Sequence, residues 1–293
     1  MPDLGDLLDA RTRRPEAIAA AAAARRRPAG LFGEHGKLMI IAADHPARGA
    51  LRAGADPLAM ANRVEQLDRI RAALARPGVN GVLGTPDILE DLLLLGALDD
   101  KVVIGSMNRG GLAGTSFEMD DRFTAYDAAS LARDGFEGGK MLLRIDPDDP
   151  STVATVEACG RAVSELASRR LLAMVEPFIS HRVDGRVRID LGAEASIRAM
   201  TVAAGIGNTS AYTWLKVPVV EDMERVMAAT TLPALLLGGE VSGAQDAAFE
   251  SWRKALKLPT VQGLVIGRSL LYPPDDDVAA AVDTAVGLLQ EGQ

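Results

Sequence analysis

Apolar runs of five to seven residues alternate with longer helix-like stretches from about residue 38 to the end of the chain. Runs this short and this continuously apolar are typical of parallel strands that are buried on both faces. The predicted strands are residues 38–44, 79–84, 102–107, 139–145, 171–176, 212–217, 234–238 and 261–267. The predicted helices are residues 57–74, 86–95, 121–133, 152–168, 193–205, 222–229, 244–257 and 277–289.

Eight strand–helix units in 293 residues predict an α/β protein with a closed (β/α)8 TIM barrel, a fold that typically takes about 250 residues. An open, doubly wound sheet is the less favoured arrangement. We expect residues 38–293 to form the barrel. Residues 1–37 are predicted to form a helical extension, because Pro15 precedes an alanine run that ends in three arginines. This extension is expected to cap the barrel or to contact a second subunit, so a homo-oligomer is a candidate assembly.

Composition excludes several classes of protein. Hydrophobic residues make up 48% of the chain and charged residues 25%, as in ordinary folded domains. No apolar run approaches the roughly 18 residues that cross a membrane. A net charge of −8 without a basic block argues against nucleic-acid binding. The single cysteine, Cys159, allows neither an internal disulfide nor a zinc site built from several thiolates. A cytoplasmic location is therefore expected. No cofactor is expected.

Polar residues collect where the predicted strands end. Active sites of such barrels lie at the carboxyl ends of the strands, so these positions are candidates for function. Asp44 and His45 follow the first strand, Arg109 follows the third, and Glu176 ends the fifth. We therefore expect their side chains to share one face of the barrel.

Side-chain alternation turns several unusual residues toward the barrel interior. In strand 139–145 the apolar alternate positions should meet the helices, which leaves Lys140 and Arg144 inside. In the sixth predicted strand the same argument leaves Trp214 and Lys216 inside. Two lysines are thus predicted to share one small interior.

Such lysines have a specific chemical use. Desolvation and neighbouring cations lower the pKa of an amine, and a neutral lysine can attack a carbonyl carbon to form a Schiff base. Glu176 or Asp44 could then move the protons. The alternative is that Lys140 and Lys216 are ion-paired to these two carboxylates and serve structure alone.

Glycines follow the last two predicted strands. Gly238 and Gly239 end the seventh strand, and Gly267 and Arg268 end the eighth. Barrels commonly bind phosphate in these two loops, where backbone N–H groups approach the anion and an arginine can grip it. Tight turns without a ligand are the alternative interpretation.

At these residues the chain resembles the class I, Schiff-base aldolases of the DeoC/LacD group, which includes deoxyribose-phosphate and tagatose-bisphosphate aldolases. The similarity covers the barrel but not the alanine-rich leader. The similarity is strongest to the tagatose-bisphosphate aldolases and to a group of bacterial barrel proteins encoded with inositol-catabolism genes. The matching segments are Ala42-Ala43-Asp44-His45-Pro46-Ala47-Arg48-Gly49, Gly139-Lys140-Met141-Leu142-Leu143-Arg144, Glu176, Leu215-Lys216-Val217-Pro218, Leu237-Gly238-Gly239 and Gly267-Arg268.

The resemblance implies a lyase of carbohydrate metabolism with a phosphorylated sugar as substrate. It makes Lys216 the Schiff-base lysine, Lys140 the second active-site lysine, Glu176 the acid/base and Asp44 the partner of a substrate hydroxyl. It also implies that Gly239 and Arg268 hold the phosphate. The remaining candidates for substrate or phosphate binding are His45, Arg109, Arg144, Gly238 and Gly267.

Three positions depart from the family's pattern and bear on the substrate. His45 stands where a glutamine is expected, Arg144 is an added cation, and Gly238-Gly239-Glu240 replaces a Ser/Ala-Gly pattern. An added inward arginine suits a substrate that carries a carboxylate as well as a phosphate. The candidate of that kind is 2-deoxy-5-keto-gluconate 6-phosphate of inositol breakdown.

Two other functions remain as alternatives. A metal-dependent aldolase or lyase would need ligands from few histidines, because the chain has only His35, His45 and His181 and no tight ligand spacing. The second alternative is a non-catalytic barrel that binds a sugar phosphate, since a fold by itself does not prove catalysis.

Overall fold

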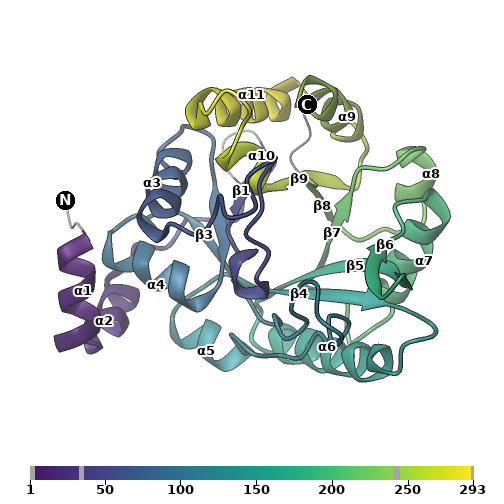
Figure 1. Ribbon diagram of the computed structural model, residues 1–293, viewed down its shortest axis with the longest axis horizontal. Coiled ribbons are helices and arrows are strands. Elements are labelled where there is room, and N and C mark those ends of the chain that lie inside the picture. Colours follow the sequence, from purple (N-terminus) through teal and green to yellow (C-terminus); the bar gives the residue numbers. More distant parts are fainter. Residues whose placement is uncertain (1–3, 33–35, 240–244, 292–293) are drawn as a thin grey trace.

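Parallel strands close into a barrel at the centre of the molecule (Figure 1). The computed structural model describes residues 4–32, 36–239 and 245–291. Neighbouring strands pair in the order β4-β3-β2-β1-β9-β8-β7-β5, and the pairing of β4 with β5 closes the ring. This confirms the predicted (β/α)8 barrel. The eight barrel strands of the described chain are β1 (Leu38–Ala42), β2 (Gly81–Gly84), β3 (Val102–Ser106), β4 (Gly138–Ile145), β5 (Leu172–Val183), β7 (Thr213–Pro218), β8 (Ala234–Leu237) and β9 (Val261–Ile266).

Helices surround this barrel, as Figure 1 shows. The helices that follow the strands are α3 (Arg63–Leu74), α4 (Pro86–Leu94), α5 (Ala128–Arg133), α6 (Ser151–Ser168), α7 (Ala193–Ala204), α8 (Met223–Met227), α9 (Gln245–Ala255) and α11 (Val278–Glu291). Two short turns of helix, η1 (Pro46–Arg48) and α10 (Arg268–Leu271), follow β1 and β9 after three residues and one residue. The first residue of the predicted helix 244–257 lies outside the described residues.

Two helices begin later than predicted, and side-chain caps explain where. The expected helix 57–74 starts only at Arg63, because the side-chain oxygen of Asn62 accepts hydrogen bonds from the N–H groups of Val64 and Glu65, at 3.1 and 3.2 Å. The expected helix 121–133 starts only at Ala128, where Asp127 and Ser130 form a capping box.

The fifth barrel strand was predicted too short. Glu176 lies within β5, which continues to Val183 and pairs with the antiparallel strand β6 (Arg186–Ile189). Asp184 and Gly185 connect the two strands with φ angles of 51° and 74°. An Asp-Gly pair between alternating residues is a strong hairpin signal, because both turn positions need positive φ. The sequence analysis missed it.

The core has an inner and an outer layer, as the alternation predicted. Inside the barrel, apolar side chains from several strands pack together, including Leu38, Ile40, Leu83, Ile104, Leu172, Met174, Leu235 and Val265. Their neighbours in sequence, such as Met39 and Met141, pack outward against the helices. Trp214 packs on the inner layer, and its ring lies 5.8 Å from that of Phe32.

The N-terminal residues form two helices, α1 (Leu4–Arg13) and α2 (Glu16–Ala24), which lie at one side of the barrel in Figure 1. Arg11 joins α1 to α4 through an ion pair with Asp91 at 2.7 Å. Arg25 pairs with Glu137, before β4, at 2.9 Å. These contacts and the Phe32–Trp214 stacking attach residues of the predicted extension to the barrel.

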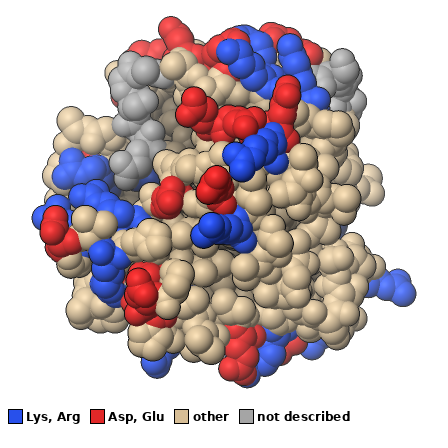
Figure 2. All heavy atoms as spheres, turned by 90° about the vertical axis from the view of Figure 1, so that its right-hand side faces the viewer, with Lys and Arg blue, Asp and Glu red and all other residues tan. Residues whose placement is uncertain are grey.

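The surface carries both signs of charge. On the side of the molecule with α7 and α8, Figure 2 shows acidic and basic side chains among larger uncharged areas. In the part of the chain that is described, no helix has both the length and the apolar character needed to cross a lipid bilayer.

Candidate active site

Five charged side chains meet in the barrel and alternate in sign. Lys140 on β4 lies between Asp44 and Glu176, with its Nζ 3.1 Å from Asp44 Oδ2 and in contact with Glu176 Oε2. The other oxygen of Glu176, Oε1, lies 2.8 Å from Lys216 Nζ on β7. Arg109 completes the row by donating to Asp44 Oδ2. The structure thus brings together four predicted catalytic residues and one predicted substrate-binding residue.

Strand alternation and register account for this meeting. Lys140 pairs in register with Met174, two residues before Glu176 on the same face of β5. On the other side of β5, Val175 pairs with Leu215, so Lys216 is the next residue along β7. All the charged groups are deeply buried, with Lys140 1% and Lys216 3% exposed. Burying a charged side chain without a partner costs free energy, and the alternating row gives each of these charges a neighbour of opposite sign.

The electrostatics of the row favour ionised carboxylates. Burial by itself would raise the pKa of Asp44, but Arg109, Lys140 and Lys216 outweigh it and hold that pKa well below its usual range. Burial likewise opposes ionisation of Glu176, whose pKa the two lysines hold below its usual range. Both groups therefore carry a negative charge near neutral pH.

Lys140 is the lysine whose pKa is shifted. Burial, assisted by the charge of Arg109, lowers the pKa of Lys140 to about 8, although Asp44 and Glu176 act in the opposite direction. A substantial fraction of this amine is therefore neutral slightly above neutral pH. The ion pairs that a purely structural role requires are present, and the same contacts place a titrating amine beside Lys216.

Ser106 is a member of the site that the sequence analysis missed. Its hydroxyl donates to Asp44 Oδ2 at 3.2 Å and accepts from Arg109 Nε at 3.0 Å. The signal was available, since Ser106 shares the inward face of β3 with Ile104. Ser106 and Asp44 together fix the position of the Arg109 guanidinium.

His45 lies at the edge of the charged row. Its Nδ1 is 3.8 Å from Asp44 Oδ1, and its side chain is 26% exposed. Burial, together with the charges of Arg268 and Lys216, lowers the pKa of His45 to about 3, so the ring is neutral at physiological pH. A neutral imidazole at this edge can donate or accept a hydrogen bond without adding charge.

Arg144 points inward as predicted, but its guanidinium group is already bound to acidic side chains. Its Nη2 and Nε bind both oxygens of Asp121, at 2.6 and 2.8 Å. Nη1 lies 3.3 Å from Glu118 Oε1, and Nη2 also donates to the Glu118 carbonyl oxygen. Arg144 therefore anchors the long segment after β3, and its predicted contact with substrate would require these bonds to break.

The predicted phosphate-binding residues lie in the loops after β8 and β9. Gly239 has a φ of 70° and open space where a Cβ would be. Gly267 has no such space, because its Cβ would lie 2.5 Å from the carbonyl oxygen of Ala42. Gly238 directly follows β8, and Arg268 begins α10 and donates to the Arg52 carbonyl oxygen at 3.5 Å. Glu240 lies outside the described residues.

Two histidines of the metal-dependent alternative, His45 and His181, are among the described residues. His181 is near the end of β5, with Nδ1 3.8 Å from Asp146 Oδ1. Within residues 4–32, 36–239 and 245–291, no group of three or more His, Cys, Asp or Glu side chains is arranged to hold a metal ion. His35 lies outside these ranges.

Comparison with known proteins identifies the family. Residues 36–286 match the protein family described as Cgl0159-like. The chain belongs to the Cgl0159-like family. The crystal structure of Cgl0159 from Corynebacterium glutamicum (Brevibacterium flavum) is 54% identical to it, with 99% of this chain and 98% of that chain covered and a TM-score of 0.95. No curated protein sequence matches the chain.

More distant structures share the fold. An archaeal fructose 1,6-bisphosphate aldolase is 17% identical, with a TM-score of 0.66 over 94% of this chain and 100% of that chain. A Schiff-base-forming fructose-1,6-bisphosphate aldolase, studied through its reaction intermediates, is also 17% identical, with a TM-score of 0.64 over 93% of this chain and 99% of that chain. At this identity the likeness shows the barrel fold.

Proposed function

We propose that this protein is a class I aldolase, which cleaves or forms a C–C bond of a phosphorylated keto sugar or keto sugar acid through a lysine Schiff base. The observation that carries the proposal is the placement of Lys140 and Lys216 on the two oxygens of one buried carboxylate, Glu176. The fold similarity to a Schiff-base-forming aldolase supports it. So does a structure of an archaeal aldolase whose catalytic lysine is bound to a carbinolamine intermediate.

In the proposed reaction the neutral amine of Lys216 attacks the keto carbon of the substrate. The resulting carbinolamine loses water to give an iminium ion. A base removes the proton of the substrate hydroxyl two carbons away, the C–C bond breaks, and its electron pair moves into the iminium to give an enamine. An aldehyde leaves, the enamine is protonated, and water releases the second product and restores the amine.

The neighbours of Lys216 supply the proton transfers in this scheme. Lys140 titrates at about pH 8, so its neutral form can take the proton that Lys216 must lose before it attacks. Glu176 is ionised in the resting site and lies 2.8 Å from Lys216, where it can stabilise the iminium charge and take up a proton transiently as the intermediates interconvert. Asp44 is proposed to bind a substrate hydroxyl through Oδ1, because Oδ2 already accepts from three donors.

The substrate is proposed to be anionic. Lys140, Lys216 and Arg109 outnumber Asp44 and Glu176, and Arg268 is close enough to His45 to influence its titration. Gly238, Gly239, Gly267 and Arg268 are proposed to hold a phosphate. A cytoplasmic location is part of the proposal, since the single cysteine can form no internal disulfide.

Borohydride reduction tests the mechanism directly. The protein is mixed with dihydroxyacetone phosphate, a panel of ketose phosphates or 2-deoxy-5-keto-gluconate 6-phosphate, then reduced and digested for peptide mass mapping. We expect a stable adduct on Lys216 and none in Lys216→Met. An adduct on Lys140 would exchange the roles of the two lysines, and turnover without any adduct would overturn the covalent mechanism.

Two controls separate the alternative functions. Activity that persists in EDTA is expected here, whereas activity that EDTA removes and a divalent metal restores would favour a metal-dependent lyase. Tight substrate binding without turnover, unchanged in Lys216→Met, would favour a non-catalytic binding barrel.

A further inference from the structure

Arg109 is held in the charged row differently from its neighbours. The two lysines and Glu176 stand on barrel strands, whereas Arg109 lies three residues beyond the end of β3, in the segment that leads to α5. It is nevertheless only 6% exposed, and its guanidinium reaches Asp44 Oδ2. Other residues must therefore fix its position.

Asn108 fixes the backbone beside Arg109. Its side chain is completely buried and binds both backbone groups of Leu142, with Nδ2 donating to the carbonyl oxygen and Oδ1 accepting from the N–H, each at 2.7 Å. Nδ2 also donates to the Asp121 carbonyl oxygen at 3.2 Å. The register of β3 with β4 ends at residue 106, so this amide continues the pairing two residues beyond the strand. Moving the segment would leave buried polar groups without partners, which costs free energy.

Two further contacts hold Arg109 itself. Its backbone N–H donates to Thr124 Oγ1 at 3.2 Å, and its Nε donates to Ser106 Oγ at 3.0 Å. Ser106 in turn donates to Asp44 Oδ2 at 3.2 Å, the same oxygen that the guanidinium contacts. Lys140 Nζ also lies 3.1 Å from this oxygen. Arg109 and Lys140 therefore share one carboxylate oxygen.

This sharing decides how much negative charge is left for Lys140. The charged groups that face its Nζ come from four different parts of the barrel; they are Asp44 after β1, Arg109 after β3, Glu176 on β5 and Lys216 on β7. Glu176 is itself shared with Lys216 through its second oxygen. On α6, behind β4, the thiol of Cys159 is neutral, because burial raises its pKa to about 12. Three cations thus divide two carboxylates.

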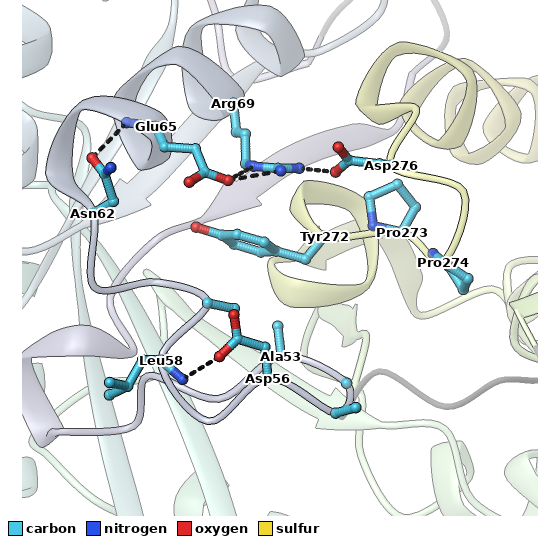
Figure 3. A pocket seen from close by; sticks show the side chains of 13 residues that line it. Ala53, Asp56, Leu58, Asn62, Glu65, Arg69, Tyr272, Pro273, Pro274 and Asp276 are labelled. Atoms are coloured by element: carbon cyan, nitrogen blue, oxygen red, sulfur yellow. Dashed lines mark hydrogen bonds and ion pairs between the residues drawn. The ribbon is translucent and has the colours of Figure 1, made fainter.

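An arginine outside the barrel shows the opposite balance. Arg69, in the cavity lined by residues of α3 and of the segment after α10, pairs with two carboxylates, Glu65 at 2.8 Å and Asp276 at 2.6 Å (Figure 3). There one cation has two carboxylates. In the row, Lys140 has no carboxylate of its own, and Arg109 is the cation that takes part of Asp44 from it.

We propose that Arg109 is a positioning residue of the reaction: by occupying Asp44, it keeps Lys140 able to release its proton and to take one from Lys216. Two like charges close together in a buried site disfavour each other's ionised form. Burial and the charge of Arg109 are the largest influences that lower the pKa of Lys140 to about 8. The use of this proton in catalysis rests on the proposed aldolase function, whereas the titration is a property of the free protein.

Titration of Lys140 without substrate tests the proposal. The chain has only six lysines, so NMR of protein with isotope-labelled lysine gives few side-chain signals, and Lys140→Arg identifies the signal of Lys140. We expect its midpoint near pH 8 in wild type. In Arg109→Met the midpoint should lie about one unit higher or more, because a neighbouring charge commonly shifts a pKa by about 1–3 units.

Two other variants separate charge from packing. Arg109→Lys retains the positive charge and should restore most of the wild-type midpoint. Ser106→Ala removes a donor to Asp44 Oδ2 and the acceptor for Arg109 Nε, so it should raise the midpoint by a smaller amount. If Arg109→Met does not fold, Ser106→Ala decides the question, and an unshifted or lower midpoint in that variant overturns the proposal.

The matched control is Arg25→Met, which removes another buried arginine from an ion pair, with Glu137 at 2.9 Å. It should lower the free energy of unfolding but leave the midpoint of Lys140 unchanged. A merely structural Arg109 would behave in the same way, so an unshifted midpoint in folded Arg109→Met overturns the proposal. A midpoint of Lys140 near 10.5 in wild type would overturn it as well.

Kinetics distinguishes this proposal from the aldolase mechanism itself. In Arg109→Met the rise of kcat with pH should move upward together with the midpoint of Lys140, while borohydride still traps substrate on Lys216. A higher KM with no shift in either quantity would make Arg109 a substrate-binding residue and overturn the positioning role, even though the Lys216 adduct still forms. A shifted midpoint in a protein that forms no adduct with any substrate would instead contradict the aldolase function and leave the effect of Arg109 on Lys140 established.

Discussion

Glu176 Oε1 lies 2.8 Å from Lys216 Nζ, inside a barrel where the two residues are 8% and 3% exposed. The other oxygen of Glu176 contacts Lys140, so one carboxylate keeps two ammonium groups close together. Without it the two cations would repel each other in a medium of low dielectric constant. Glu176 is therefore the residue on which both the stability and the chemistry of the row depend.

Replacing Glu176 by glutamine should cost stability and activity together. Removing one member of a buried ion pair typically costs about 3–5 kcal/mol, because its partner loses compensation. We expect urea unfolding to show a free energy of unfolding that is lower by about that amount in Glu176→Gln. We expect its kcat to fall at least about a thousandfold, because the charge and the proton transfer are lost together. Glu165→Gln, at an exposed position on α6, should change neither. A Glu176→Gln variant as stable and active as wild type would contradict the assignment.

The pKa of Lys140 predicts how activity depends on pH. Burial lowers this pKa from 10.5 to about 8, so the neutral amine grows in as the pH rises through 8. If that amine takes a proton from Lys216, kcat should rise between about pH 7 and 9 and then level off. Lys140→Arg keeps a permanent charge, so its plot of kcat against pH should lack this rise. If kcat of Lys140→Arg still rises over the same pH range, the titration belongs to another group.

The Arg144–Asp121 pair is predicted to be structural. Both side chains are almost fully buried, and the pair fastens the segment after β3 to β4. We expect Arg144→Met and Asp121→Leu each to lower the free energy of unfolding in urea by about 3–5 kcal/mol. The double variant should be more stable than either single variant. The exposed pair Arg161–Glu157, at 3.5 Å, is the control and should contribute less than about 1 kcal/mol. Additive losses in the double variant would refute the pairing.

The barrel and the inward lysines could be predicted because they depend on local periodicity. Alternation along β4 and β7 is sufficient to place Lys140 and Lys216 inside, and the structure has them there. The pairing of Arg144 depends instead on Asp121, which lies 23 residues earlier in a segment without regular structure. No period in the sequence indicates such a contact, so the arginine was assigned to the substrate.

The end of β5 was missed for a different reason. The apolar run ends at Glu176-Pro177, and proline commonly ends a strand. The strand nevertheless continues, because residues 178 and 179 still pair with β4 and residues 180–183 pair with β6 through the Asp184-Gly185 turn. Turn chemistry, rather than hydrophobic pattern, carried that information.

Arg268 provides the test of the proposed phosphate site. A hydrogen bond to a charged group contributes about 1.5–3 kcal/mol, so Arg268→Gln should raise KM for a phosphorylated substrate about ten- to hundredfold with a smaller change in kcat. An unphosphorylated analogue should be turned over equally by both proteins. Arg52→Gln is the matched control, because the hydrogen bond from Arg268 goes to the backbone carbonyl oxygen of Arg52, which the substitution retains. If Arg268→Gln impairs both substrates equally, the guanidinium acts on the reacting part of the substrate or on the fold, and the phosphate assignment fails.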